Sequence, residues 1–187
     1  GLYAHYEAGI SIHDTFLFAP ALTALGFWYR QLMGESVGKE CDREGHVVNA
    51  GLTPTVSIGS TDLHSVGQLY LGGPRDKVTT FVWVAAPHDT VSLPAERSFP
   101  GVVPMIAGRD AGEVMHAILE GTKAAYRAAE RPYLEVVVPQ LDAHSLGQVL
   151  QMKMLEIMYL AELMQVNAFD QPNVESYKIE TKRLLES

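Results

Sequence analysis

Cysteine is almost absent from this sequence, because Cys41 is the single one among 187 residues. One cysteine can form neither an internal disulfide nor a cysteine-based zinc site, so the composition favours a reducing compartment. Long apolar runs are also missing, and no stretch reaches the roughly 20 apolar residues that span a membrane. We therefore expect a cytoplasmic protein without membrane contacts.

Positive charge is scarce as well. Lys and Arg number 14 against 22 Asp and Glu, which gives a formal net charge of −8. This balance argues against nucleic-acid binding and against attachment to an anionic membrane. An anionic ligand would have to be bound by a local site, because the overall charge does not attract it. The phosphate-binding motifs GxxxxGK[ST] and GxGxxG are both absent.

What remains is an ordinary globular composition, with 47% hydrophobic and 19% charged residues. Apolar periodicity and turn residues predict helices and strands in alternation. The predicted helices cover 21–37, the segment from Ser60 or Thr61 to about Tyr70, 111–130, 143–164 and 172–185; the predicted strands cover 55–58, 78–85 and 133–138.

This alternation predicts one α/β domain with three layers, in which helices flank a mainly parallel sheet. Three strands are fewer than the about five or six of an average sheet. We expect the others either as weak strands in the proline-rich segment 86–108 or in a part of the protein outside this chain. The nearly continuous apolar strand at 78–85 should be buried on both faces.

Gln31 and Glu35 are four residues apart and share one face of the first predicted helix. Glu35 lies near the end of this helix, between Gly34 and Gly38, where a ligand can approach the backbone. The alternative is that both simply belong to the solvated face of the helix.

His64 falls in the first turn of its predicted helix, where the helix dipole favours a neutral imidazole that can act as acid or base. The alternative is a local capping role. Asp62 and His64 are two residues apart on a helix, so their side chains do not face the same way and we expect no metal site. Lys178 in the last predicted helix could equally be a surface residue paired with Glu175.

Three separated segments decide between these alternatives together. Residues 28–39 read WYRQLMGESVGK, residues 59–70 read GSTDLHSVGQLY, and residues 167–178 read NAFDQPNVESYK. In this order they resemble the WYRQLxxESxGK, GxxDQHSxxQLY and NxFDQxGVExxK segments of the glucose-6-phosphate isomerase (phosphoglucose isomerase) family. Leu63 and Asn173 depart from the usual Gln and Gly of that family. Asn tolerates a left-handed backbone, whereas Leu63 removes a polar group next to His64.

The resemblance implies a fold of two sugar-isomerase (SIS) domains, each a flavodoxin-like parallel sheet flanked by helices. Residues 1–187 are similar to the second of these, the C-terminal SIS domain with its helical tail. The N-terminal SIS domain, which holds the substrate phosphate in the family, has no counterpart in the chain, so we expect residues 1–187 to be a fragment that is inactive alone.

The resemblance also implies the reaction, an interconversion of glucose 6-phosphate and fructose 6-phosphate through a cis-enediol in glycolysis and gluconeogenesis. It assigns the proton transfer between C1 and C2 to Glu35, ring opening to His64, contact with the ring-oxygen region to Lys178 and substrate positioning to Gln31. His64 would come from the neighbouring subunit of a homodimer. Neither a metal nor an organic cofactor is needed.

Two other functions stay open, a non-catalytic SIS module that binds a sugar phosphate and a purely structural dimerisation domain. The SIS module does not need Glu35, His64 and Lys178 together, so their joint presence favours descent from the enzyme. The structural domain predicts an apolar surface without a polar cleft. If Glu35 and Lys178 act on one sugar, they should converge on one cleft.

Overall fold

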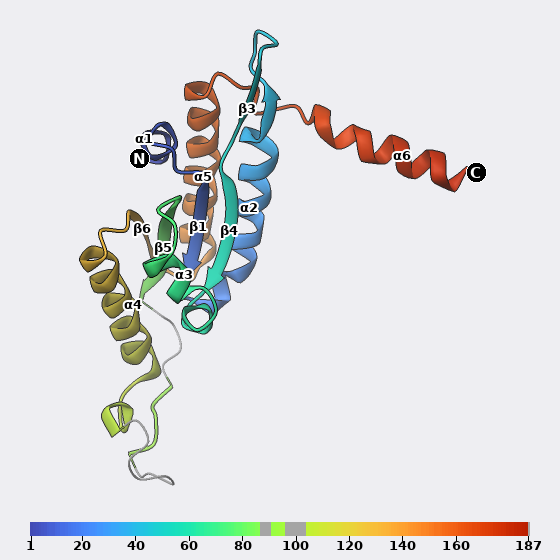
Figure 1. Cartoon of the computed structure of the whole chain (residues 1–187). Coiled ribbons are helices and arrows are strands. Elements are labelled where there is room, and N and C mark those ends of the chain that lie inside the picture. The colour runs from blue at the N-terminus through green and yellow to red at the C-terminus, as the bar shows by residue number, and fades with distance from the viewer. Residues whose placement is uncertain (87–90, 96–103, 187) are drawn as a thin grey trace.

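The computed structural model describes residues 1–86, 91–95 and 104–186, and it is built of both helices and strands (Figure 1). The α-helices and strands, in chain order, are α1 (Leu2–Glu7), β1 (Ile12–Leu17), α2 (Thr23–Val37), β2 (Lys39–Cys41), β3 (Val47–Ala50), β4 (Thr53–Ile58), α3 (Gly67–Gly72), β5 (Lys77–Ala86), α4 (Ala111–Ala128), β6 (Tyr133–Gln140), α5 (Ala143–Leu163) and α6 (Glu175–Leu185). Short 3₁₀ helices η1 to η4 cover Pro20–Leu22, Thr61–Leu63, Pro104–Ile106 and Pro172–Val174.

The main sheet has the strand order β4-β1-β5-β6, and all its neighbouring strands are parallel. The three predicted strands correspond to β4, β5 and β6, and β5 is buried along most of its length. The predicted α/β class with a mainly parallel sheet is therefore confirmed.

Strand β1 is the element that the sequence prediction missed, although it lies inside the sheet and pairs with both β4 and β5. Its sequence is IHDTFL, and His13 and Asp14 are both 0% exposed. A buried strand with two ionisable residues in a row breaks the apolar pattern by which buried strands are recognised. The sheet therefore gains its missing strand ahead of the first predicted helix.

Internal hydrogen bonds compensate the burial of these polar side chains in part, because among the described residues His13 Nδ1 and Asp14 Oδ2 have no partner. The carboxylate of Asp14 accepts hydrogen bonds from Thr55, Ser57 and Tyr70, while burial raises its pKa. On the other face of the sheet, His13 Nε2 lies 2.8 Å from the hydroxyl of Thr80. Burial, with a smaller contribution from the ammonium of Lys153, lowers the pKa of His13 to about 3, so the imidazole is neutral.

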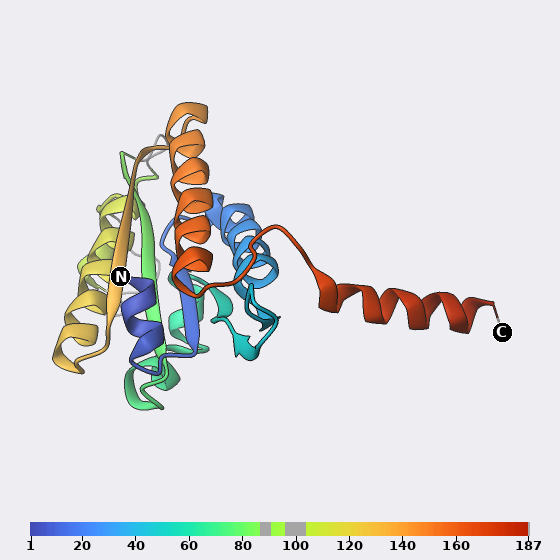
Figure 2. The same ribbon diagram turned by 90° about the horizontal axis from the view of Figure 1, so that it is seen from above.

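Helices cover both faces of the sheet (Figure 2). On one face α2 and α5 pack together, with Tyr29, Met33, Ile157 and Leu160 in a shared apolar cluster. On the other face α3 and α4 cover a mainly aromatic cluster, whose buried members are Phe16, Phe18, Tyr70, Phe81, Leu119 and Tyr126. This is the expected three-layer arrangement.

The helix predicted from Ser60 or Thr61 to Tyr70 is wrong as a continuous element. The chain instead forms η2 and then, after His64, the separate helix α3. The predicted helices at 111–130 and 143–164 correspond closely to α4 and α5, whose N-caps are Asp110 and Asp142. The segment 86–108 lies partly outside the described residues; its described part holds η3 and an isolated bridge between Ser92 and Asp110.

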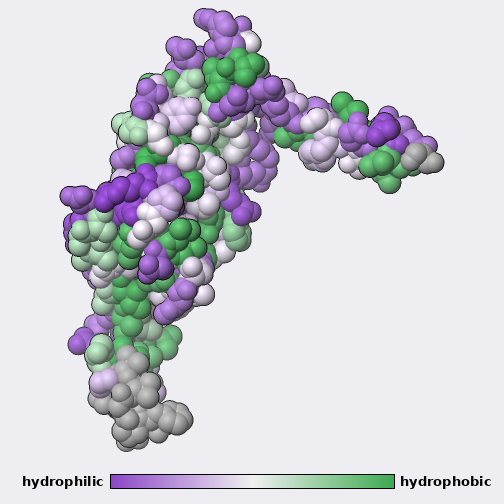
Figure 3. Space-filling model, in the orientation of Figure 1, coloured by the Kyte–Doolittle hydropathy of each residue, from purple (hydrophilic) through white to green (hydrophobic). Residues whose placement is uncertain are grey.

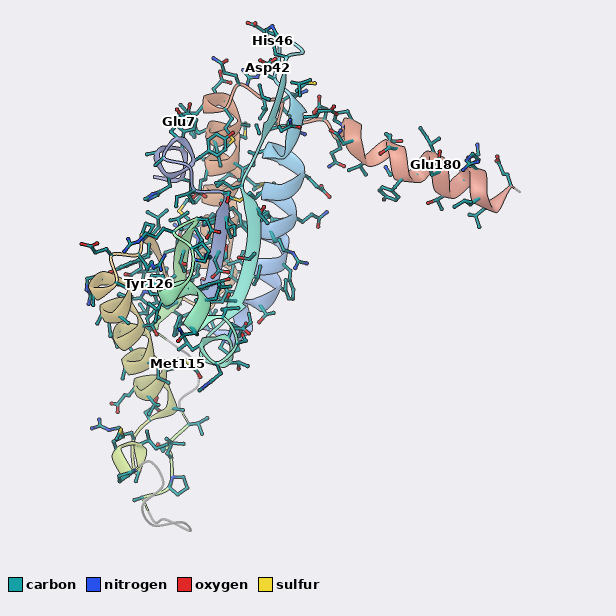
Figure 4. All side chains as sticks on the ribbon, viewed as in Figure 1. Glu7, Asp42, His46, Met115, Tyr126 and Glu180 are labelled. Carbon is teal, nitrogen blue, oxygen red and sulfur yellow. The ribbon has the colours of Figure 1, made fainter. Side chains whose placement is uncertain are left out.

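Two further features were not predicted. Helix α1 packs on α5, and β2 and β3 form an antiparallel hairpin separate from the main sheet. Asp42 and His46 lie at the tip of this hairpin (Figure 4), where Asp42 Oδ1 accepts hydrogen bonds from the backbone of Glu44 and His46.

The last helix, α6, projects from the body of the domain in both views (Figures 1 and 2). Its surface is hydrophilic with interspersed hydrophobic residues (Figure 3), and Tyr177 and Ile179 are more than 60% exposed. Within the described ranges, none of the helices has the length and apolar character needed to cross a membrane.

Candidate active site

Helix α2 carries Glu35 to the edge of the sheet at which the parallel strands begin. The helix starts after the carboxyl end of β1 and runs back along the sheet, so that Gly34 lies beside Pro54 at the start of β4. Tyr29 and Met33 turn into the core and are at most 2% exposed. Glu35 therefore lies on the open side of the helix, as its spacing predicted.

Two amides hold the carboxylate of Glu35. Gln31 Nε2 donates to Oε1 over 3.1 Å, and Gln171 Nε2 donates to Oε2 over 2.8 Å. The structure thus confirms that Gln31 and Glu35 are neighbours on one helix face. It adds Gln171, which sequence reasoning did not single out although it belongs to the segment 167–178.

The segment that contains Gln171 crosses the end of α2 and is fixed there by further polar contacts. Asn167 donates to Asp170 over 2.9 Å, and Asn173 donates to Glu40 over 2.8 Å. A cavity of about 740 Å³ lies between this segment and the β2–β3 hairpin. The cavity is lined by Glu40, Arg43 and Asn173 but not by Glu35, so it lies beside the site formed by Glu35, Gln31 and Gln171.

Lys178 lies near the start of α6, and its side chain is 51% exposed. Its ammonium forms an ion pair with Glu175 over 2.7 Å, and this hydrogen bond and charge raise the pKa of Lys178. The pairing with Glu175 that the sequence offered as an alternative is therefore present. The convergence of Glu35 and Lys178 on one cleft stays a prediction. The segment just before α6 does contact Glu35, through the side chain of Gln171.

His64 lies at the opposite edge of the sheet, in the loop that follows the carboxyl end of β4. The expected place in the first turn of an α-helix is wrong, because His64 is the C-terminal cap of η2. Its side chain is exposed, and within the described part of the chain no group is hydrogen-bonded to the imidazole. The helix-dipole argument for a neutral imidazole therefore does not apply.

Asp62 shapes the loop that presents His64. Its Oδ2 accepts a hydrogen bond from the backbone of Ile58 over 2.7 Å, and its Oδ1 accepts one from the hydroxyl of Ser65 over 2.8 Å. Asp62 is therefore a loop-forming residue. Throughout the ranges that the structure describes, no group of three or more His, Cys, Asp or Glu side chains is arranged to hold a metal ion.

The length of β4 separates the two candidate groups. Glu35 is next to the start of β4, whereas His64 follows its end, and the strand between them is about 16 Å long. A proton-transfer site needs its groups within hydrogen-bond reach of one substrate. One copy of this domain cannot bring Glu35 and His64 to the same small sugar.

The fold, together with Glu35 and His64, defines the class of protein. It is a three-layer α/β domain with a hydrogen-bonded carboxylate where the parallel strands begin and an exposed imidazole where they end. Comparison with known families narrows the class. Residues 1–187 match the family described as phosphoglucose isomerase. The chain belongs to the phosphoglucose isomerase family.

Individual relatives carry the corresponding name. The chain is 35% identical over 179 residues to a glucose-6-phosphate isomerase from Carboxydothermus hydrogenoformans, and 37% identical over 183 residues to a probable glucose-6-phosphate isomerase from Haloarcula marismortui. These alignments cover 96% and 98% of this chain but only 39% of each relative. The chain therefore spans well under half the length of these curated relatives.

Solved structures have the same fold. A hypothetical protein from Thermus thermophilus superposes with a TM-score of 0.91 at 31% identity, and the match covers all of this chain and 43% of that protein. A glucose-6-phosphate isomerase from Chlamydia trachomatis superposes with a TM-score of 0.80 at 17% identity, over 95% of this chain and 35% of its own. The second likeness concerns the fold alone.

Proposed function

We propose that this chain is the C-terminal SIS domain and helical tail of a glucose-6-phosphate isomerase, which interconverts glucose 6-phosphate and fructose 6-phosphate. Family membership supports the activity, and the 39% coverage of the relatives supports a part of a longer enzyme. The observation that carries the proposal is the exposed carboxylate of Glu35, held in place by the amides of Gln31 and Gln171.

This arrangement suits a base that moves one proton between two carbons. In the open-chain aldose, Glu35 takes the proton from C2 while the C1 carbonyl oxygen gains a proton, which gives the cis-enediol. Glu35 then returns its proton to C1 while the C2 hydroxyl loses its proton and becomes the ketone carbonyl, so that one proton moves from C2 to C1 and one from O2 to O1. Substrate and product are isomers, so the step needs no oxidant, reductant or cofactor. Amide donors fix the carboxylate without protonating it, so it stays available as a base.

The second part of the proposal is a homodimer in which His64 acts on the substrate bound by its partner. The separation of Glu35 and His64 along β4 supports this, because a second copy can supply the imidazole that one copy cannot bring to Glu35. His64 then assists ring opening. Lys178 contacts the ring-oxygen region, and Gln31 orients the substrate as well as Glu35.

The remaining partner in the proposal is an N-terminal SIS domain that binds the substrate phosphate. Exposed apolar side chains on α5 support a protein partner on that face, with Met152, Leu155 and Met158 all more than 40% exposed and Tyr159 at 69%. The substrate chemistry and the single cysteine suit a cytoplasmic enzyme.

Subunit mixing tests the proposal directly. Glu35→Gln and His64→Ala variants of the intact enzyme are each assayed alone, then dissociated, mixed in equal amounts and reassembled. Each mixed dimer then contains one site with both residues intact and one site with neither, so the mixture should recover about a quarter of the wild-type sites. Fructose 6-phosphate is the substrate, and a coupled dehydrogenase reports glucose 6-phosphate.

The outcomes separate the parts of the proposal. No recovery on mixing, with both single variants inactive, would show that each site draws both residues from one copy. Near-normal turnover by Glu35→Gln alone would remove Glu35 as the base and with it the proposed mechanism. Substrate binding without turnover by the wild-type protein would instead favour the non-catalytic SIS module.

A further inference from the structure

Lys39 has an unusual environment for a lysine. It begins strand β2 directly after the segment that carries Glu35, and its side chain is only 4% exposed. Burial of an ammonium group is costly unless the charge is paired and hydrogen-bonded. The position of Lys39 therefore needs partners that compensate this cost.

Those partners come from two parts of the chain that are far apart in sequence. Lys39 Nζ donates to the backbone carbonyl of Glu35 over 2.9 Å, in the last turn of α2. It also donates to the backbone carbonyl of Asp170, and its ion pair with Asp170 Oδ1 spans 3.2 Å. Two hydrogen bonds and one ion pair therefore compensate the burial of the ammonium group.

These contacts form a closed ring that includes Glu35, Lys39, Asp170 and Gln171. Lys39 binds the main chain of Glu35 on one side and Asp170 on the other, and the next residue, Gln171, donates to Glu35 Oε2. A shift of Asp170 would therefore move the amide that holds the carboxylate. A helix C-terminus also favours a nearby cation, which strengthens the contact to the Glu35 carbonyl.

We propose that Lys39 is a positioning residue, which fixes Glu35 and Gln171 relative to each other and anchors the segment that leads to Lys178. The inference rests on the proposed function, because it assigns Lys39 a part in aligning the base. Lys39 itself does not touch the substrate. Misplacement of a reacting group by about 1 Å costs on the order of 100-fold in rate, so loss of the ring should reduce turnover.

Lys77 provides a matched control. It is another buried lysine, with 6% of its side chain exposed, and it likewise donates to a backbone carbonyl, that of Pro74, and pairs with an aspartate, Asp76. Its partners are its own sequence neighbours at the start of β5, and none belongs to the Glu35 ring. A general effect of removing a buried ammonium should therefore appear in Lys77→Met as well.

The experiment compares Lys39→Met and Lys77→Met in the intact enzyme, each with and without Gln171→Ala. Lys39→Met should lower kcat by about 10- to 100-fold with a smaller change in KM. In the Gln171→Ala background the same change should have little further effect, since the ring is already open. Lys77→Met should stay within about twofold of its background in both cases.

Amide hydrogen exchange of residues 167–174 gives a readout that is independent of catalysis. Lys39→Met should speed exchange in this segment, and Lys77→Met should not. If Lys39→Met does not fold, Asp170→Asn, which keeps the backbone acceptor, should show the same effects in weaker form.

Unchanged exchange together with normal kcat would overturn the proposal. Faster exchange with a kcat loss that is fully additive to that of Gln171→Ala would also overturn it, because Lys39 would then hold the tail without aligning the base. Failure of the proposed function has a different signature. Glu35→Gln would then turn over normally, while the exchange measurement would still report whether Lys39 holds the tail.

Discussion

The two edges of the main sheet differ in how they present their functional candidates. At the amino edge, Glu35 is held by Gln31 and Gln171, and the surrounding segments are joined by a buried lysine. At the carboxyl edge, His64 is exposed on a loop that is held by hydrogen bonds from Ile58 and Ser65 to the side chain of Asp62. The comparison teaches that this chain holds the carboxylate of Glu35 with two amide donors but leaves the imidazole of His64 exposed on a loop.

This difference agrees with the proposed division of labour between two copies. A base that must reach both C1 and C2 of a substrate needs a fixed carboxylate, because proton transfer depends on close approach. A group that acts on a neighbouring subunit must instead stay accessible until the dimer forms. The following predictions test the difference between the edges, from the largest effect to the smallest.

Removal of the proposed base, Glu35, at the amino edge should have the largest effect. Glu35→Gln in the intact enzyme should lower kcat by about 10²–10⁴-fold while KM changes little, since the amide keeps the shape and loses the proton transfer. Glu40→Gln is the control, because Glu40 accepts a hydrogen bond from Asn173 near the same site. Equal losses in the two variants would indicate a general charge effect in place of a specific base.

Removal of the imidazole at the carboxyl edge should have a smaller and substrate-dependent effect. His64→Ala should slow turnover of the cyclic sugar phosphate at least about tenfold more than proton exchange on an open-chain analogue, since only the cyclic form needs ring opening. Steady-state kinetics and solvent proton exchange measure the two rates. Equal losses on both substrates would assign His64 a positional role.

The strand between the two edges should make stability depend on pH through His13. The folded pKa of about 3 lies below the ordinary value of 6.5, so the unfolded chain binds more protons between these values and stability falls as the pH falls. From pH 7 to pH 5 the loss should be about 2 kcal/mol.

Urea denaturation of residues 1–187 at both pH values measures this loss, with His13→Gln as the comparison. The variant should lose most of the pH dependence, because glutamine does not titrate. The raised pKa of Asp14 acts in the opposite direction but is common to both proteins. An unchanged pH dependence in the variant would show that another group is responsible.

The smallest effect is expected from the loop beneath His64. Asp62→Ala removes the acceptors of Ile58 and Ser65 and should lower stability by about 1 kcal/mol, with a moderate loss of turnover because His64 is displaced. Asp42→Ala removes comparable contacts at the hairpin tip and is the control. Asp42→Ala should lower stability by a similar amount and leave kcat unchanged. A loss of kcat in both Asp62→Ala and Asp42→Ala would contradict a specific effect on His64.

Local patterns made much of this molecule predictable. The apolar runs of β5 and β6 and the periodicity of α2, α4 and α5 identified the α/β class, and the spacing of Gln31 and Glu35 placed both on one helix face. Strand β1 was not predicted because the hydrogen-bond partners of its polar residues, Thr55, Ser57, Tyr70 and Thr80, lie on neighbouring elements. A sequence window does not contain those partners.

The sequence by itself therefore determined which residue types are available and which short segments form helices and strands, because both depend on neighbours a few positions apart. The tertiary structure alone decided that Gln171 reaches Glu35 across 136 positions and that Lys39 binds Asp170 across 131. It also decided that Glu35 and His64 lie at opposite ends of β4. Parallel strand direction places the end of α2 beside the start of β4, and the loop with His64 beyond its end, and no local pattern encodes that separation.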